Sequence, residues 1–308
     1  MLTGWLINDR LTCILGTKTF WHDLLNWFPD LQDKTNGHTS FNVLAKHIEE
    51  EAIKKGLPDF VIRNASFFRK LNFKTKTISY LQDAYESLND KNLPRQLNVC
   101  NTSNIVVCNS PFVKSLYKDK IKSKIEIIPI GTDFKFFKPL NNKEELRKKW
   151  NILPYSILFV GSNAPIKGFK KILSLINETK YNFCLVMKDN TKILHDRVKT
   201  FNNLNQQEML EVFNCCTLLI CTSIQETQHL AGIEAAACGL PIVTTKVGIY
   251  YDMESGPWGK IVEDSLFVQE IENVFSNLNF FKPREFFLQK GLDKETCKNR
   301  WITLVKEI

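Results

Sequence analysis

The stretch that decides the fold is residues 217–247, which read TLLICTSIQETQHLAGIEAAACGLPIVTTKV. An apolar run typical of a buried β-strand leads through a polar loop into a segment with helical spacing, and a second β-type run follows Pro241. Earlier segments repeat this order, with strand-like runs at 156–160 and 181–188 and helix-like runs at 169–179 and 206–214. Alternating strands and helices predict a parallel, doubly wound α/β sheet.

The first half of the chain repeats this plan less regularly. Strand-like runs cover 2–9, 58–64, 76–83, 104–110 and 124–130, and the best helical patterns cover 20–28 and 41–56. The mixed segment 30–40 is expected to be a loop that turns at Asn36-Gly37. We therefore predict two Rossmann-like domains, at 1–134 and 135–285, and a closing helix at 286–308 that packs back on the first domain.

The composition is that of an ordinary folded protein. Hydrophobic residues make up 44% of the 308 residues and charged residues 24%, which excludes disorder as the main state. Apolar stretches are too short to span a bilayer, and Asp9 and Arg10 come too early for a signal-peptide core, so we expect a cytoplasmic protein. The nine cysteines include no Cys-x-x-Cys pair and are expected to be reduced and to pack as small hydrophobes.

Two carboxylates flank the start of the predicted helix in the deciding stretch. Glu226 ends the loop, and Glu234 lies eight positions later. The exposed amides of a helix N-terminus attract a phosphate oxygen, whereas carboxylates repel it and instead accept hydrogen bonds from sugar hydroxyls, each contributing about 1.5 to 3 kcal/mol. The spacing alone leaves open that Glu234 only caps or solvates its helix. Gly161, Glu226 and Lys246 each follow a predicted strand, where ligands of doubly wound sheets bind.

The Glu-x7-Glu spacing, with the continuation AAACGLP, resembles the retaining glycosyltransferases of family 4, which are group 1 enzymes with the GT-B architecture. The resemblance covers most of the chain. Residues 104–117 and 125–139 resemble the end of the family's first domain, 157–173 the opening of its second, and 284–301 its closing helix. It implies a GT-B fold, in which two Rossmann-like doubly wound domains face a central cleft, here with a compact N-terminal domain.

The resemblance also implies roles for single residues. Glu226 would bind donor-sugar hydroxyls near the reacting carbon, and Glu234 would bind the ribose hydroxyls. Lys167 would stabilise the negative charge that the departing diphosphate gains in the transition state. Without the family context, Lys167 reads as a solvated lysine before a turn at Gly168.

The start of the predicted helix would supply the other diphosphate contacts. These are the backbone amides of His229, Leu230 and Ala231. His229 lies beside the first glutamate, where a donor contact is expected, whereas His22 reads as partly buried among the aromatic residues of its own helix. The loop at 227–229 is TQH, where the family has Gly-aromatic-Gly, so the donor-sugar pocket is expected to be reshaped.

Other positions also depart from the family pattern. Ser162, which follows Gly161 at the end of the opening strand, stands where the family usually has an arginine. The N-terminal glycine loop is reduced to Gly16. The position of the catalytic histidine of many relatives falls at Gln82 and Asp83. Either side chain is able to hydrogen-bond a sugar or acceptor hydroxyl, and we take Asp83 as the catalytic candidate.

The leading hypothesis is a retaining hexosyltransferase that uses a nucleoside-diphosphate sugar, such as a UDP-sugar. The alternatives are a sugar-nucleotide epimerase of the same fold and a non-catalytic nucleotide-binding GT-B module. No Asp-x-Asp metal clamp is present, so neither a metal nor another cofactor is expected to be required.

The acceptor is less defined than the donor. A glycan or lipid-linked glycan is favoured and DNA is an alternative, while the net charge of +8 admits any anionic partner, including peripheral contact with a membrane surface. The densest basic run, at 114–124, is either a phosphate-facing surface or a solvated helix end.

Overall fold

The computed structural model describes residues 3–7, 23–28, 30–33, 56–66, 68, 74–84 and 90–308. It divides the chain into two compact units, Met1–Gly131 with Glu295–Ile308, and Thr132–Lys294. Gly16, His22, the Asn36-Gly37 turn and residues 41–55 of the helix predicted at 41–56 lie outside the described residues.

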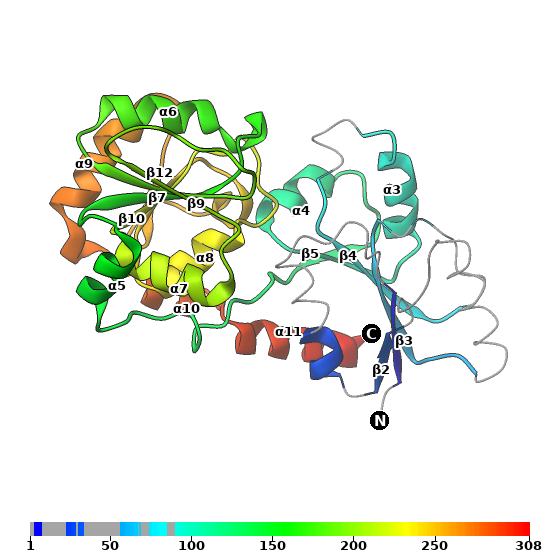
Figure 1. Cartoon of the computed structure of the whole chain (residues 1–308). Helices are drawn as coiled ribbons and strands as arrows, with labels where there is room; N and C mark the ends of the chain where they lie inside the picture. Colours follow the sequence, from blue (N-terminus) through cyan, green and yellow to red (C-terminus); the bar gives the residue numbers. More distant parts are fainter. Residues whose placement is uncertain are drawn as a thin grey trace. The chain divides into compact units, whose positions relative to one another are not determined.

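The described residues of the first unit form a six-stranded parallel sheet with the order β2-β1-β3-β4-β5-β6 (Figure 1). Its strands are β1 (Gly4–Ile7), β2 (Leu31–Asp33), β3 (Phe60–Asn64), β4 (Lys76–Leu81), β5 (Ile105–Cys108) and β6 (Lys124–Ile127). Helices α3 (Leu93–Asn101) and α4 (Pro111–Tyr117) cover one face, where Val113 and Tyr117 pack with Val106 and Cys108. Ser110 caps α4 by accepting a hydrogen bond from the amide of Val113.

The second unit, all of whose residues are described, contains another six-stranded parallel sheet, ordered β12-β11-β10-β7-β8-β9. Its strands are β7 (Ser156–Gly161), β8 (Asn182–Met187), β9 (Val198–Asn202), β10 (Leu218–Cys221), β11 (Ile242–Thr244) and β12 (Gly259–Ile261). The chain adds strands outward from β7 on one side and from β10 on the other. The strand order therefore reverses between β7 and β10, and ligands of doubly wound sheets bind beyond the carboxyl ends of the strands at such a point.

Helices cover both faces of the second sheet (Figure 1). Ile157 and Phe159 of β7 pack with α6 (Phe169–Glu178) and α9 (Phe267–Ser276), while the intervening Leu158 packs with the opposite layer. This alternation follows from the two-residue period of a strand. The opposite layer consists of α5 (Lys143–Trp150), α7 (Gln206–Cys215), α8 (Leu230–Ala237) and α10 (Pro283–Gln289). The expectation of doubly wound parallel sheets is thus confirmed.

Some predicted elements were wrong in detail. Residues 31–33 were expected in a loop but form an edge strand that pairs in parallel with β1. Two further edge strands, β9 and β12, were not predicted, because short or mixed edge strands carry little of the apolar pattern that marks a buried one. The closing segment forms α10 and a separate helix, α11 (Lys294–Glu307). No helix among the described residues combines the length and apolar character needed to cross a bilayer.

Candidate functional site

Lys167 and Glu226 meet at the carboxyl edge of the second sheet. Lys167 ends the short helix η2 (Pro165–Lys167) that follows β7, and Glu226 lies in the loop that follows β10. The Lys167 Nζ atom donates to Glu226 Oε1 at 2.6 Å, and the Ser223 hydroxyl donates to the same oxygen at 2.8 Å. Both charged side chains keep some exposure, 31% for the lysine and 13% for the glutamate. The pair therefore lies where the strand order predicts a ligand.

The backbone around Lys167 is held against the end of β10. The Thr222 hydroxyl donates to the carbonyl oxygens of Lys167 and Gly168, and the Ile224 amide donates to the carbonyl of Ile166 at 2.8 Å. Gly168 has a φ of +65°, and a Cβ atom there would lie 1.9 Å from the carbonyl oxygen of Thr222. Only glycine fits this position without strain, so the contact restricts where the lysine side chain begins.

Helix α8 begins beside this pair. His229 is its N-cap residue and has a left-handed backbone with a φ of 71°. Its ring nitrogen Nδ1 lies 3.0 Å from the hydroxyl of Tyr250. Gly232 makes room for this contact, because a Cβ atom there would lie 2.0 Å from the Tyr250 hydroxyl. No side chain caps the start of α8, so the amides of Leu230 and Ala231 are available to an anion, whereas the Gly232 amide donates to the His229 carbonyl oxygen.

Glu234 lies in α8, on the same element as these amides. Its side chain is half-buried, and none of the described residues forms a hydrogen bond or ion pair with it. Burial raises the pKa of Glu234 to about 7, although the charge of His229 partly opposes this effect. A half-buried carboxylate without a donor is suited to a ligand that brings hydroxyl donors.

Neighbouring charges shift the pKa values of Glu226, His229 and Cys221. Burial by itself would raise the pKa of Glu226, but the charges of His229 and Lys167 and the hydrogen bonds to Glu226 lower it. Burial would also lower the pKa of His229, but Cys221 and Glu226 raise it. The thiol of Cys221 is buried, which would raise its pKa, yet the charge of His229 and a hydrogen bond to it bring the pKa below the usual value. The charged forms of Glu226, His229 and Cys221 therefore favour one another.

The remaining predicted residues have other surroundings. Gly161 is the last residue of β7, and the Ser162 hydroxyl that follows accepts a hydrogen bond from the Ala164 amide at 3.4 Å. Asp83 belongs to the first unit, just beyond β4, where the Ser66 hydroxyl donates to its carboxylate. Gly16 lies outside the described residues.

Sequence reasoning missed three residues that contact this site. Cys221 ends β10 and Ser223 lies in the loop that follows, five and three positions before Glu226, so their proximity was a readable signal. Tyr250 reaches His229 from a segment 21 positions away and gave no such signal.

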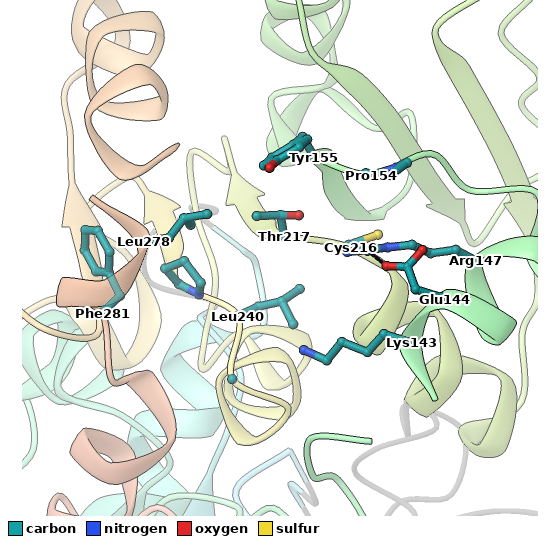
Figure 2. Close-up of a pocket in the computed structure, with 12 residues that line it drawn as sticks. Lys143, Glu144, Arg147, Pro154, Tyr155, Cys216, Thr217, Leu240, Leu278 and Phe281 are labelled. Carbon is teal, nitrogen blue, oxygen red and sulfur yellow. Dashed lines mark hydrogen bonds and ion pairs between the residues drawn. The ribbon is translucent and has the colours of Figure 1, made fainter. Parts of the chain in front are cut away.

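A cavity of about 540 Å³ lies at the opposite edge of the same sheet (Figure 2). Tyr155, Thr217 and Leu240 line it, just before the starts of β7, β10 and β11. Lys143 and Phe281 contribute from helix α5 and from the segment before α10. Because all the strands are parallel, this cavity lies at their amino ends and is separate from the Lys167–Glu226 pair.

Residues 154–277 match the family described as glycosyl transferases group 1. An uncharacterized glycosyltransferase of Methanocaldococcus jannaschii is 26% identical over 159 residues, which is 47% of this chain and 41% of that protein. The matched part thus spans about two fifths of this curated relative.

Solved structures resemble the whole chain. Anabaena HepE in complex with UDP matches with a TM-score of 0.81 and 16% identity, over all of both chains. The lipopolysaccharide outer core galactosyltransferase WaaB matches with a TM-score of 0.76 and 13% identity, also over all of both chains. These likenesses define the fold class, which is GT-B. The residues that match the glycosyl transferases group 1 family lie within the second unit, which contains Lys167, Glu226 and α8.

Proposed function

We propose that the chain is a retaining glycosyltransferase that moves a hexosyl group from a nucleoside-diphosphate sugar to an acceptor hydroxyl. The observation that carries this proposal is the 2.6 Å pair between Lys167 and Glu226 at the carboxyl edge of β7 and β10. The pair lies next to the uncapped start of α8, within the part of the chain that matches the family.

Each group has a separate task in this proposal. Glu226 accepts hydrogen bonds from sugar hydroxyls, and the ammonium of Lys167 stabilises charge on the departing diphosphate. The amides of Leu230 and Ala231 bind phosphate oxygens, and Glu234 accepts the ribose hydroxyls. A UDP-sugar is the first donor to test, because structures of the similarly folded HepE contain UDP and UDP-glucose.

The test is a panel of labelled nucleotide sugars, incubated with and without acceptors. Transfer that requires an acceptor and keeps the anomeric configuration, read by nuclear magnetic resonance, supports the proposal. Release of free sugar without an acceptor indicates the epimerase alternative instead. Nucleotide binding without turnover on any acceptor indicates a non-catalytic module.

We also propose that transfer needs no metal ion. Lys167 and the α8 N-terminus supply the positive charge that a cation provides in metal-dependent transferases. Activity is therefore expected to survive excess chelator. Complete loss that magnesium or manganese restores would contradict this part of the proposal.

The proposed acceptor is a glycan or a lipid-linked glycan. WaaB, which shares the fold, acts on the lipopolysaccharide outer core. Transfer assays with three acceptors separate the acceptor classes. The acceptors are a soluble glycan, a glycan on a lipid carrier and hydroxymethylated DNA.

A further inference from the structure

Three chemically different metal-ligand groups converge at the end of β10. They are the thiol of Cys221, the carboxylate of Glu226 and the imidazole of His229, and their ligand atoms all lie within 4.8 Å of one another. Among the described residues no other set of three histidine, cysteine or acidic side chains is arranged in this way. None of the predicted roles of Glu226 and His229 requires the cysteine.

We propose that Cys221, Glu226 and His229 form an inhibitory zinc site within the donor-binding region. Thiolate, imidazole and carboxylate are all common Zn²⁺ ligands, at about 2.0 to 2.3 Å from the ion. Small side-chain shifts therefore suffice to bring the three ligand atoms, now within 4.8 Å of one another, to bonding distance from one ion. Magnesium and manganese prefer oxygen ligands, so a donor set containing sulfur and nitrogen selects zinc over them. Three protein ligands leave a fourth position for water.

The surrounding structure holds two of these ligands in place. Cys221 is buried at the end of β10, where it pairs with Thr244 of β11. His229 is fixed by its left-handed backbone and by the contact between Nδ1 and the Tyr250 hydroxyl. A hydrogen bond of this kind orients a ligand histidine and leaves its other ring nitrogen for the metal.

Lys167 determines which oxygen of the Glu226 carboxylate is left for a metal ion. Its ammonium holds Oε1 of Glu226, so the other carboxylate oxygen remains for an ion. On binding, the thiol and imidazole ligands release any bound protons to solvent, and zinc coordinates the thiolate and the neutral imidazole. A Glu226 carboxylate bound to zinc no longer accepts hydrogen bonds from the donor sugar. Inhibition therefore competes with the donor, and this one step rests on the proposed function.

Cobalt(II) is the probe for the metal site, because it takes zinc sites and its bond to a thiolate absorbs light. Chelator-treated protein is expected to develop a thiolate-to-cobalt charge-transfer band that saturates at one ion per chain and disappears on addition of zinc. Cys221→Ser should remove the band and weaken zinc binding by more than the 10- to 100-fold that a lost outer-shell partner typically costs. Cys216→Ser is the matched control, because Cys216 is also buried but lines the cavity at the opposite sheet edge.

Absence of the band, or its persistence in Cys221→Ser, would overturn the proposal. Circular dichroism and a second variant, Cys221→Ala, establish that a lost band does not reflect unfolding. In the transfer assay, zinc is expected to raise the apparent KM for the donor in the wild-type protein and not in Cys221→Ser.

The two readouts separate the metal site from the proposed function. A cobalt band in a protein that transfers no sugar upholds the metal site and removes the glycosyltransferase proposal. A cobalt band together with donor kinetics that zinc leaves unchanged overturns the inhibitory role.

Discussion

Glu226 shows how neighbouring groups adapt a single carboxylate to its site. It is mostly buried, yet the charges of His229 and Lys167 hold its pKa below the usual value. It therefore stays ionised at neutral pH, which strengthens the hydrogen bonds that it accepts.

Replacing Glu226 with glutamine tests this role. Glu226→Gln is expected to lower the transfer rate about 10- to 100-fold, the equivalent of one charged hydrogen bond, because the proposed function places the lost charge against the donor sugar. Affinity for the nucleoside diphosphate, measured by calorimetry, should change little. Glu263→Gln, at an exposed position before α9, is the control. Unchanged turnover in Glu226→Gln would remove this residue from the mechanism.

Glu234 offers a prediction about pH and stability. Its pKa is near 7 in the folded chain against an ordinary value of 4.5, so the folded state binds the proton more tightly. Below pH 4.5 both states are protonated. Between pH 4.5 and 7 only the unfolded state ionises, so stability falls as the pH rises, and above pH 7 a constant penalty of up to about 3 kcal/mol remains.

Glu234→Gln should abolish this pH-dependent loss. Denaturant unfolding at several pH values is expected to show the variant gaining stability relative to the wild-type protein between pH 4.5 and 7. Parallel stability curves for the two proteins would show that burial does not perturb Glu234. A nucleoside diphosphate should reduce the difference in the wild-type protein, because ribose hydroxyls give the ionised carboxylate its donors.

At the scale of elements, the contact between η2 and the end of β10 positions Lys167. Gly168→Ala is expected to destabilise the protein by about 1 to 3 kcal/mol, because a Cβ atom would strain the left-handed backbone and approach the Thr222 carbonyl. The same change should weaken donor binding by displacing Lys167. Thermal unfolding and donor titration measure the two effects.

Gly239→Ala separates backbone strain from steric overlap. Gly239 also has a positive φ, +89°, but the nearest atom to a Cβ there would be the Cγ of Pro139 at 3.7 Å. It should therefore destabilise the protein less than Gly168→Ala and leave donor affinity unchanged. Equal losses in the two variants would mean that the close approach to Thr222 is unimportant.

At the scale of the whole molecule, the net charge of +8 affects which kind of acceptor the protein can bind. Four of the five lysines in the run 114–124 are exposed, although Lys124 forms an ion pair with Glu126 at 2.7 Å. Lys74 and Lys76, at the start of β4, are also exposed, while Lys70 lies outside the described residues. If the acceptor is a polyanion, we expect these lysines to contact its phosphates.

A salt series distinguishes a polyanionic acceptor from a neutral one. If the acceptor is DNA, each phosphate contact should lower the logarithm of affinity by about 0.7 to 0.9 per log unit of salt, because binding releases counterions. A neutral glycan should show almost no salt response. We expect the flat response. A steep one, together with sugar transfer to hydroxymethylated and not to plain DNA, would replace the glycan proposal with DNA.

Local sequence determined much of this structure. The buried strands β7, β8 and β10 and the start of α8 near His229 were readable, because burial imposes a periodic apolar pattern on a single element. Glu226 and Glu234 were identified as candidates from one local motif. Lys167 was identified only because residues 157–173 resemble the opening of the family's second domain.

Only the tertiary structure decided which of these groups touch. Lys167 and Glu226 are 59 positions apart and meet because β7 and β10 are adjacent at the reversal of strand order. Tyr250 likewise reaches His229 from a segment 21 positions away. The edge strands β2, β9 and β12 likewise depend on a neighbour for pairing. Such contacts join segments far apart in the chain, and no periodicity within one segment encodes them, because their free energy arises only when the sheet assembles.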